Sequence, residues 1–237
     1  MKLKGQIGLV TGAGRGIGRA IAKTLAAEGA TVFLASRTLF ELQNVQREIQ
    51  EQGGNAVVVP SDISREDDVD GLFGEIRRVH NRLDIVVNNA GIGTFAPVRA
   101  MKIADFDAMW NLNVRGLFLV TRQALQLMEP QRNGIIVNIS SLAGKNAFVN
   151  GAGYASTKWA LMGFSKCLML EEREFGIRVV TICPGSVDTT FGETQTDAAR
   201  AAKIPSPQDI ADVVLSAIMI HPRAMVSEID IRPTNPK

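Results

Sequence analysis

The stretch Thr11-Gly-Ala-Gly-Arg-Gly-Ile-Gly18 decides the fold expected for this chain. It follows a short β-rich run, Gln6–Thr11, and leads into a helical pattern with Ile17, Ile21 and Leu25 on its apolar face. Residues without a Cβ let the backbone turn tightly and approach a pyrophosphate, whose charge is bound by N–H groups at a helix N-terminus. A glycine-rich turn between a strand and a helix therefore predicts a dinucleotide-binding site.

The glycines of this turn follow the spacing Gly-x-x-x-Gly-x-Gly rather than the stricter Gly-x-Gly-x-x-Gly. In the stricter pattern the third glycine would fall on Ile17. The physical reasons are the same for both, because each places small residues where a strand passes into a helix. The residues expected to contact the cofactor here are Gly12, Gly14, Arg15, Gly16, Ile17 and Gly18.

Short β-rich runs alternate with longer helical patterns along the chain. The near-continuous apolar runs Ile85-Val-Val and Ile135-Ile-Val are typical of strands buried on both faces of a parallel sheet. The order predicts an α/β protein, a single-domain Rossmann fold over residues 1–237 with a doubly wound, seven-stranded parallel sheet and helices on both faces. The expected strands are Gln6–Thr11, Thr31–Ser36, Ala56–Pro60, Asp84–Asn88, Gly134–Ser140, Ile177–Cys183 and Met225–Ile231. The expected helices are Gly16–Gly29, Leu39–Gln52, Glu66–Asn81, Ile103–Met128, Gly153–Phe175 and Pro207–His221.

Composition fits one globular domain, with 237 residues of which 46% are hydrophobic and 21% charged. A net charge of +2 without a long run of one sign gives no reason to expect a nucleic-acid partner. Cys167 and Cys183 lie in apolar runs without metal-ligand spacing, so we expect two buried thiols, no metal and a reducing, cytoplasmic environment. The early first strand leaves no room for a signal peptide, and no apolar run is long enough to span a membrane.

The end of the second strand, Ala35-Ser36-Arg37, bears on which nicotinamide cofactor binds. An Asp or Glu there would bind the adenosine ribose hydroxyls and repel a 2′-phosphate, and neither is present. A hydroxyl and a guanidinium stand there instead, and Arg15 lies in the glycine turn; together these suit a phosphate group. We therefore predict NADP(H) rather than NAD(H), although either arginine could be a solvated surface charge.

Tyr154 and Lys158 are four residues apart in Gly-Tyr-Ala-Ser-Thr-Lys, and Ser141 precedes the tyrosine by thirteen residues. Residues at i and i+4 share one face of a helix. An ammonium near a phenol stabilises the phenolate and lowers the phenol's pKa, which would let Tyr154 exchange a proton with an alcohol or carbonyl oxygen at neutral pH. Taken alone, the pair is more often a surface contact.

With these residues in place, the chain resembles the short-chain dehydrogenase/reductase family over nearly its whole length. The overall pattern is most similar to bacterial 3-oxoacyl-[acyl-carrier-protein] reductase-like members, a broad group that leaves the substrate open. The resemblance rests on five motifs in the family's order, namely Thr11–Gly18, Asn88-Asn-Ala-Gly91, Asn113 in Asn-Val-Arg-Gly, Ser141 with Tyr154-x-x-x-Lys158, and Pro184-Gly185 with Thr189.

The resemblance implies roles for four catalytic residues. Tyr154 would give a proton to the carbonyl oxygen during reduction, and Ser141 would hold that oxygen. Lys158 would lower the pKa of the tyrosine and bind the nicotinamide ribose. Asn113 would position a water that links Lys158 to solvent. The remaining implied cofactor contacts are Ser36, Arg37, Asp62, Ile63, Asn89, Ala90, Gly91, Tyr154, Lys158, Pro184, Gly185, Val187 and Thr189.

Three alternatives remain at this stage. Ser140 competes with Ser141, although only Ser141 has the family's spacing to the tyrosine. Asn111 competes with Asn113, although the following Val-Arg-Gly favours Asn113. Asn88 and Asn89, at the end of the fourth strand, could serve only to satisfy buried backbone at the bend.

Two helical patterns, 103–128 and 153–175, are apolar over most of their circumference, whereas a helix that covers a sheet needs one apolar stripe. We therefore expect a homodimer or homotetramer through these helices, the alternative being that the helices lie deeper in the core of their own subunit. Residues 189–204 are polar and alanine-rich and indicate a substrate lid. The functions to be weighed are an NADP(H)-dependent carbonyl reductase or alcohol dehydrogenase, a 3-oxoacyl thioester reductase proper, and a non-catalytic NADP-binding sensor.

Overall fold

The computed structural model describes residues 1–191 and 201–234. Its centre is a seven-stranded parallel sheet in the order β3-β2-β1-β4-β5-β6-β7. The order reverses between β1 and β4, which confirms the doubly wound sheet predicted from the sequence. The strands are β1 (Ile7–Thr11), β2 (Thr31–Ser36), β3 (Asn55–Pro60), β4 (Ile85–Asn88), β5 (Gly134–Ile139), β6 (Ile177–Pro184) and β7 (Glu228–Ile231).

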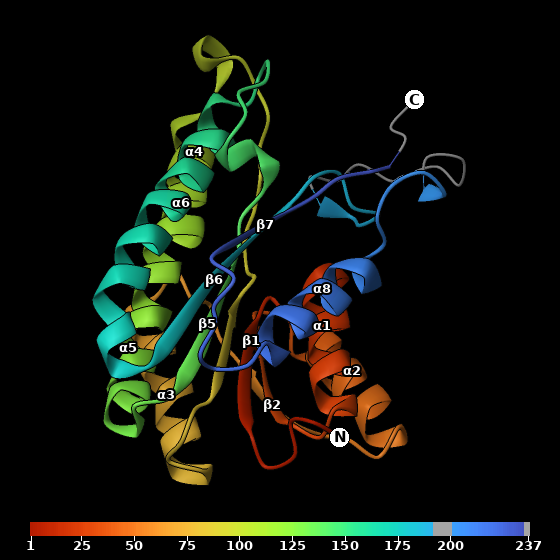
Figure 1. The fold of residues 1–237 in the computed structure, drawn as a ribbon. Helices are drawn as coiled ribbons and strands as arrows, with labels where there is room; N and C mark the ends of the chain where they lie inside the picture. Colours follow the sequence, from red (N-terminus) through yellow and green to blue (C-terminus); the bar gives the residue numbers. More distant parts are fainter. Residues whose placement is uncertain (192–200, 235–237) are drawn as a thin grey trace.

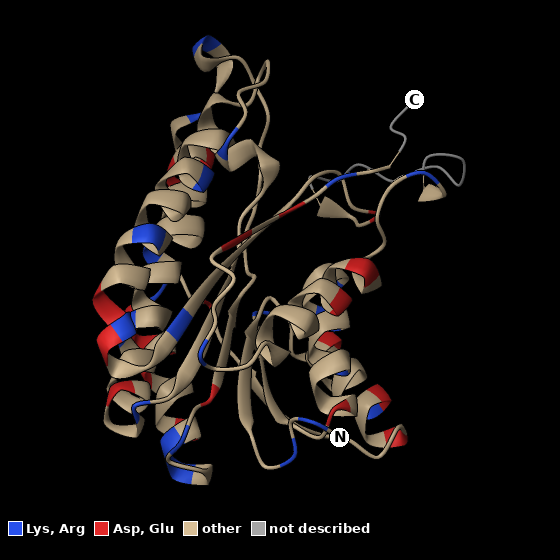
Figure 2. Cartoon of the chain, in the orientation of Figure 1, with Lys and Arg blue, Asp and Glu red and all other residues tan. Residues whose placement is uncertain are grey.

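Helices cover both faces of the sheet (Figure 1). On one face α1 (Gly16–Ala27), α2 (Leu39–Glu51) and α8 (Pro207–Met219) pack on one buried apolar cluster. On the other face α3 (Glu66–Val79), α5 (Leu117–Gln131) and α6 (Ala152–Glu172) pack on a second cluster. Both faces of the central strands are thus buried, which is why those strands are apolar without alternation. Basic and acidic residues both occur along the helices of the two layers (Figure 2).

The long helix expected over 103–128 is helical from Ile103 to Gln131 but not uniform. It consists of α4 (Ile103–Trp110), a π-helical segment η2 (Asn111–Gly116) and α5. A π-turn inserts an extra residue into the helix and often occurs at functional sites. Here it holds Asn113 with 2% of its surface exposed, directly beneath the loop that follows β4.

Two sequence-based expectations were wrong in detail. The last strand starts at Glu228 rather than Met225, because Met225 instead accepts a hydrogen bond from the Val179 N–H through its sulfur (3.3 Å) and pairing with β6 begins at Ser227. Cys183 is buried as expected, but Cys167 is exposed. It lies on α6, which also exposes the apolar side chains of Trp159 and Leu170.

Three 3-10 turns complete the described elements: η1 (Val98–Ala100), η3 (Leu142–Gly144) and η4 (Arg173–Phe175). None of the described helices is both long enough and apolar enough to cross a membrane.

Candidate active site

A cavity of ≈ 940 Å³ lies at the carboxyl ends of the strands, where ligands bind in folds of this kind. It runs from the glycine turn after β1 to the loops after β5 and β6. Almost every predicted site residue lines it; Gly18 and Asn113 do not. The predicted residues that line the cavity are Gly12, Gly14, Arg15, Gly16, Ile17, Ser36, Arg37, Asp62, Ile63, Asn89, Ala90, Gly91, Ser141, Tyr154, Lys158, Pro184, Gly185, Val187 and Thr189.

The glycine turn is held by the loop after β4. The Asn89 side-chain amide donates to the carbonyl oxygens of Thr11 (3.0 Å) and Gly12 (3.3 Å), and the Thr11 hydroxyl accepts the backbone N–H groups of Asn89 and Ala90. Gly12 and Gly16 have φ values of +64° and +54°, a region that disfavours residues with a Cβ. These bonds fix the turn that starts α1, and Gly16 and Ile17 at the start of that helix line the cavity.

Gly18, which does not line the cavity, is closely packed between the turn and the loop after β4. A Cβ at this position would lie 2.2 Å from the Gly12 carbonyl oxygen and 2.5 Å from the Asn89 side-chain nitrogen. Only glycine lets α1 approach the turn this closely. Replacing Gly18 would therefore displace the turn and its bond to Asn89 together.

Unpartnered polar groups gather at the end of the cavity next to β2. The Ser36 hydroxyl is buried and has no hydrogen-bond partner. Arg15 and Arg37 are exposed, and within the described residues neither guanidinium has a hydrogen bond or ion pair. Free guanidinium groups beside an orphaned hydroxyl suit a phosphorylated ribose.

Sequence reasoning missed a carboxylate at the same corner. Glu41, in the first turn of α2, lines the cavity, and a Cβ on Gly14 would lie 2.8 Å from its Oε2 and 3.2 Å from the Ser36 Oγ. The end of β2 carries no acidic residue, as predicted, but the first turn of α2 places the Glu41 carboxylate at the same end of the cavity. Its position four residues after Arg37, on the helix, was the available signal.

Asp62 and Ile63 lie after β3 and line the cavity, as expected. The Asp62 carboxylate accepts the N–H (3.0 Å) and hydroxyl (2.7 Å) of Ser64, so it shapes its own turn. Ile63 is almost fully buried against Gly116 in the π-helical segment. Their backbone placement thus couples the β3 loop to the helix that carries Asn113.

Tyr154, on α6, is 7% exposed at the other end of the cavity. Burial raises the pKa of its phenol to about 12, although a hydrogen bond with Ser141 acts in the opposite direction. The expected lowering of this pKa by Lys158 is therefore not seen in the chain by itself. A phenol with this pKa is fully protonated at neutral pH, as a proton donor must be.

Lys158 lies one helical turn along α6, 4% exposed, with its Nζ 5.8 Å from the centroid of the Tyr154 ring. Its Nζ donates to the Ile139 carbonyl oxygen at 3.0 Å. Burial lowers the pKa of this ammonium to about 8. The Lys158 side chain therefore remains mainly protonated at neutral pH, although burial makes the charged form costly.

The structure separates Asn113 from its alternative Asn111, and Ser141 from its alternative Ser140. Asn113 holds the loop after β4, accepting the Ile92 N–H (2.9 Å) and donating to the Ile92 carbonyl oxygen (2.9 Å) and the Thr157 hydroxyl (3.0 Å). Asn111 lies on the outer surface beside Trp110. Ser141 accepts the Ala143 N–H (3.1 Å), whereas the Ser140 hydroxyl is buried without a partner.

Gly91 lies where these groups meet. A Cβ there would lie 3.2 Å from the Asn113 Oδ1 and 3.7 Å from the Lys158 Nζ. Asn88, by contrast, does not line the cavity. Its side chain donates to the Asn138 amide oxygen (2.9 Å) inside the sheet, so its role is structural.

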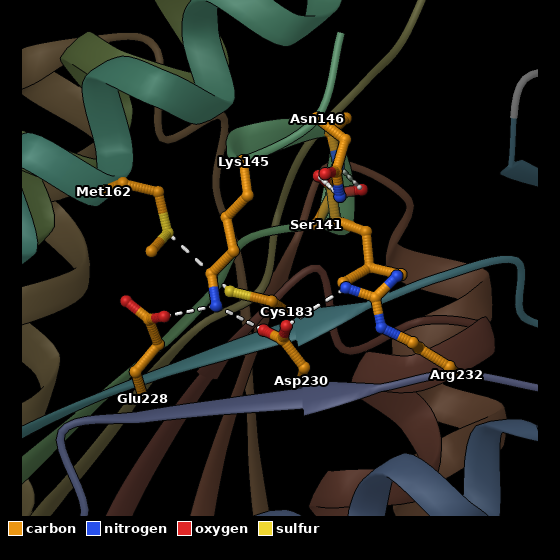
Figure 3. Close-up of polar contacts among 10 residues, drawn as sticks. Ser141, Lys145, Asn146, Met162, Cys183, Glu228, Asp230 and Arg232 are labelled. Atoms are coloured by element: carbon orange, nitrogen blue, oxygen red, sulfur yellow. Dashed lines mark hydrogen bonds and ion pairs between the residues drawn. The ribbon is translucent and has the colours of Figure 1, made fainter. Parts of the chain in front are cut away.

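An ion-pair network under Ser141 was not anticipated from the sequence (Figure 3). Lys145, just after η3, pairs with both Glu228 and Asp230 of β7, and Asp230 also accepts a hydrogen bond from Arg232 (3.2 Å). Nearby, burial raises the pKa of the Cys183 thiol to about 11. The network fastens the turn after Ser141 to the edge strand, and thereby restricts the position of the serine.

The segment after β6 carries the last predicted contacts. Pro184, Gly185 and Val187 line the cavity, and the Thr189 methyl group faces Gly16 of the glycine turn. Residues 192–200 of the expected lid, 189–204, lie outside the described residues. Within the described ranges, His, Cys, Asp and Glu side chains form no group of three or more that could hold a metal.

The residues present fit a nicotinamide dinucleotide. A Cβ at Gly12, Gly14 or Gly18 would clash with neighbouring protein atoms, so only glycines allow this tight turn at the start of α1. The N-terminus of a helix at such a turn suits a pyrophosphate. Ser36 supplies an unpartnered hydroxyl at one end of the cavity, and Lys158 supplies an ammonium beside Tyr154 at the other. The two ends of the cavity thus match the two ends of one cofactor.

Comparison with known proteins agrees with this geometry. The sequence profile described as short chain dehydrogenase matches residues 6–200, so the chain belongs to the short-chain dehydrogenase/reductase family, a family of oxidoreductases. It is 36% identical over 231 residues to an uncharacterised oxidoreductase of Staphylococcus aureus strain MRSA252, covering 98% of each chain.

Solved structures are similar over almost the full length. One is a metagenomic short-chain oxidoreductase in complex with NADP, with a TM-score of 0.88, 38% identity, and coverage of 99% of this chain and 100% of that chain. Another is a 7α-hydroxysteroid dehydrogenase in complex with NADH and 7-oxo glycochenodeoxycholic acid, with a TM-score of 0.89, 30% identity, and coverage of 97% and 94%. The chain is therefore an NAD(P)-dependent oxidoreductase of this family.

Proposed function

We propose that the protein is an NADP(H)-dependent carbonyl reductase, able to act in reverse as an alcohol dehydrogenase. The observation that carries the proposal is one cavity that holds the glycine turn at one end and Ser141, Tyr154 and Lys158 at the other. A bound nicotinamide would supply or accept hydride at the substrate carbon. The protein's own task is then to bind the carbonyl oxygen and to give it a proton.

Each catalytic residue has a distinct part in this proposal. The Ser141 hydroxyl orients the substrate oxygen, and the protonated phenol of Tyr154 donates to it as negative charge develops. The Lys158 ammonium stabilises that charge and returns a proton to the Tyr154 phenolate. Asn113 holds the loop after β4 in place beside them. We also propose that the protein is cytoplasmic, because a thiol such as the exposed Cys167 stays reduced there.

The preference for NADP(H) is supported by the free guanidinium groups of Arg15 and Arg37 beside Ser36. Glu41 acts against it, because a carboxylate at this corner repels a 2′-phosphate and can accept hydrogen bonds from ribose hydroxyls. We propose that the two arginines outweigh the single carboxylate. The protein would then prefer NADP(H) to NAD(H), but by a smaller factor than it would without Glu41.

A panel assay tests both the reaction and the cofactor. Ketones, sugars and acetoacetyl thioesters are incubated with NADPH or NADH, and loss of nicotinamide absorbance is followed. We expect carbonyl-dependent oxidation with a higher kcat/KM for NADPH. Removing one charge-assisted phosphate contact in Arg37→Ala should raise the KM for NADPH by about 10- to 100-fold and leave that for NADH within about twofold. Glu41→Gln should lower the KM for NADPH.

The outcomes separate the two claims. Absence of any carbonyl-dependent turnover would leave the non-catalytic sensor as the better description. A higher kcat/KM with NADH than with NADPH would contradict only the cofactor preference. Strong selectivity for thioesters would favour the 3-oxoacyl thioester reductase over a general carbonyl reductase.

We also propose that the chain forms a homodimer or homotetramer through the outer faces of α4, α5 and α6. Phe106, Phe118, Trp159 and Leu170 are exposed there, and a shallow hollow lies beside Trp110. Contiguous exposed apolar side chains on packed helices are typical of subunit interfaces.

Light scattering at micromolar concentration tests this assembly. The expected mass is that of two or four chains, and Trp159→Glu, which would bury a charge in the interface, should give monomers. Phe40→Glu, on exposed α2 in the opposite layer, is the matched control and should leave the mass unchanged. A monomeric wild-type protein would contradict the proposal.

A further inference from the structure

Three phenylalanines surround the catalytic end of the cavity, each from a different loop. Phe95 follows β4, Phe148 follows η3, and Phe191 follows β6, and all three line the cavity with Tyr154. We refer to Phe95, Phe148 and Phe191 as the phenylalanine enclosure. The loops differ in sequence position by up to about a hundred residues, so the sequence alone gives no sign that these rings meet.

The rings contact one another in geometries favoured by aromatic pairs. The ring centroids of Phe95 and Tyr154 are 5.5 Å apart at 75°, and those of Tyr154 and Phe191 are 5.6 Å apart at 57°. Phe148 joins through Phe95, with centroids 5.8 Å apart. Centroid separations of this size are typical of stabilising edge and offset contacts.

Glycines make room for two of the rings. A Cβ on Gly93 would lie 2.9 Å from the Phe191 ring and 3.1 Å from the Tyr154 ring, and a Cβ on Gly151 would lie 2.5 Å from the Phe148 ring. A hydrogen bond from the Ala96 N–H to the Asn150 carbonyl oxygen (3.0 Å) ties the loops of Phe95 and Phe148 together. The backbone is thus shaped around the enclosure.

The enclosure leaves its apolar surface uncovered. Phe95, Phe148 and Phe191 are 45%, 46% and 41% exposed, although they lie in a concave site. Large apolar side chains left open in a pocket are typical of a ligand site. Leu142 and Ala147 extend the same apolar lining.

Among the described residues, each charged group of the cavity is buried, paired with another charge, or located at the cofactor end. In the described part of the chain, Lys158 is buried and Arg232 is held by Asp230. The other charged side chains that line the cavity lie at the cofactor end, namely Arg15, Arg37, Glu41 and Asp62. Among the described residues, the site beside Tyr154 therefore offers flat apolar faces and hydroxyl groups, and the Lys158 ammonium there is buried and bonded to the Ile139 carbonyl oxygen.

We propose that the substrate carries an aromatic ring next to its carbonyl group, and that the phenylalanine enclosure binds this ring while Ser141 and Tyr154 bind the oxygen. The proposal rests on the carbonyl reductase function and specifies its substrate class. Aromatic pairing adds to the gain from burying apolar area, and so selects an aryl ketone over an aliphatic or charged one.

The experiment compares acetophenone, 2-butanone and pyruvate as substrates of the full chain with NADPH. We expect kcat/KM for acetophenone to exceed that for the other two by at least about tenfold, since it buries several more carbon atoms. Phe148→Leu keeps an apolar side chain and should lower kcat/KM for acetophenone by about 3- to 10-fold. Its effect on 2-butanone should stay below about twofold.

Phe40→Leu is the matched control, because Phe40 is an exposed phenylalanine that does not line the cavity. It should leave all three substrates unchanged. Circular dichroism of both variants checks the fold. The proposal would be overturned if Phe148→Leu lowered kcat/KM equally for acetophenone and 2-butanone. A higher wild-type kcat/KM for pyruvate or 2-butanone than for acetophenone would also overturn it.

A binding measurement separates this proposal from the function beneath it. Saturation-transfer NMR on acetophenone should show contact to its ring protons in the wild type, and a weaker signal in Phe148→Leu. Ring contact without turnover of any carbonyl would contradict the reductase function and support the aromatic site. Turnover of small ketones without ring contact would support the reductase and overturn the aromatic site.

Discussion

Tyr154→Phe is expected to lower kcat for carbonyl reduction by about a thousandfold, within the range for loss of a general acid. The substitution removes one hydroxyl and keeps the ring that contacts Phe95 and Phe191. Packing of the site should therefore survive, while the proton donor is lost. Steady-state kinetics with NADPH and the best ketone of the panel measure the effect.

Cofactor binding separates loss of chemistry from loss of the site. The dissociation constant for NADPH, measured by nicotinamide fluorescence, should change by less than about threefold in Tyr154→Phe, because kcat and binding report different interactions. Turnover close to that of the wild type would refute the role of Tyr154 as proton donor. A large rise in the dissociation constant would instead show that the hydroxyl mainly supports cofactor binding.

A serine pair serves as an internal comparison. Ser141→Ala removes the hydroxyl that hydrogen-bonds with Tyr154 and should lower kcat by about 10- to 1000-fold, the range for loss of an oxyanion-type donor. Ser140→Ala removes a neighbouring hydroxyl that has no hydrogen-bond partner, and its effect should be far smaller. Comparing kcat of the two variants thus distinguishes loss of substrate orientation from a general disturbance of the loop.

The sheet and most of its boundaries could be predicted because buried parallel strands have a strong sequence signature. Thr31–Ser36 was predicted to the residue, since it lies between a glycine turn and a helix. Met225–Ile231 was placed too early because its first residues are apolar but contact β6 by a side chain instead of pairing. Hydrophobicity reports burial, and it does not distinguish pairing from packing.

The glycine turn at the cofactor end of the cavity could be predicted, because its backbone conformation depends on the local sequence. Backbone turns such as Gly12–Gly18 need glycine at fixed positions, so their sequence is constrained locally. Glu41 and the phenylalanine enclosure depend on contacts between distant segments. No local pattern marks Phe95, Phe148 and Phe191 as neighbours, because each is an ordinary apolar residue in its own loop.

The pKa of Tyr154 shows a further limit of reasoning from spacing. Two residues at i and i+4 share a helix face, which correctly places Lys158 beside the tyrosine. Spacing says nothing of burial, and burial dominates here, raising the phenol's pKa and lowering that of the ammonium. The charged form of Lys158 is thus held in an environment that disfavours it.

Lys158→Met should therefore stabilise the protein while it abolishes most of its activity. A pKa of about 8 instead of 10.5 corresponds to roughly 3 kcal/mol by which burial disfavours the ammonium. Methionine has a similar length and no charge, but the variant loses the hydrogen bond to the Ile139 carbonyl oxygen, at a cost of about 1 to 2 kcal/mol. The expected net gain in the free energy of unfolding at pH 7 is about 1 to 2 kcal/mol, and kcat should fall by at least about a hundredfold.

The pH dependence of this gain identifies its cause. The folded state binds the Lys158 proton less tightly than the unfolded state, so the penalty is fully present below pH 8 and disappears as the pH rises towards 10.5. Tyr154 and Cys183 have raised pKa values and shift stability the opposite way, but they are present in both proteins. The difference between wild type and variant, from urea unfolding at pH 7 and pH 9.5, should therefore decrease with pH. A variant less stable than the wild type at pH 7 would show that the ammonium is stabilised by its surroundings. An advantage that does not change with pH would show that methionine simply packs better.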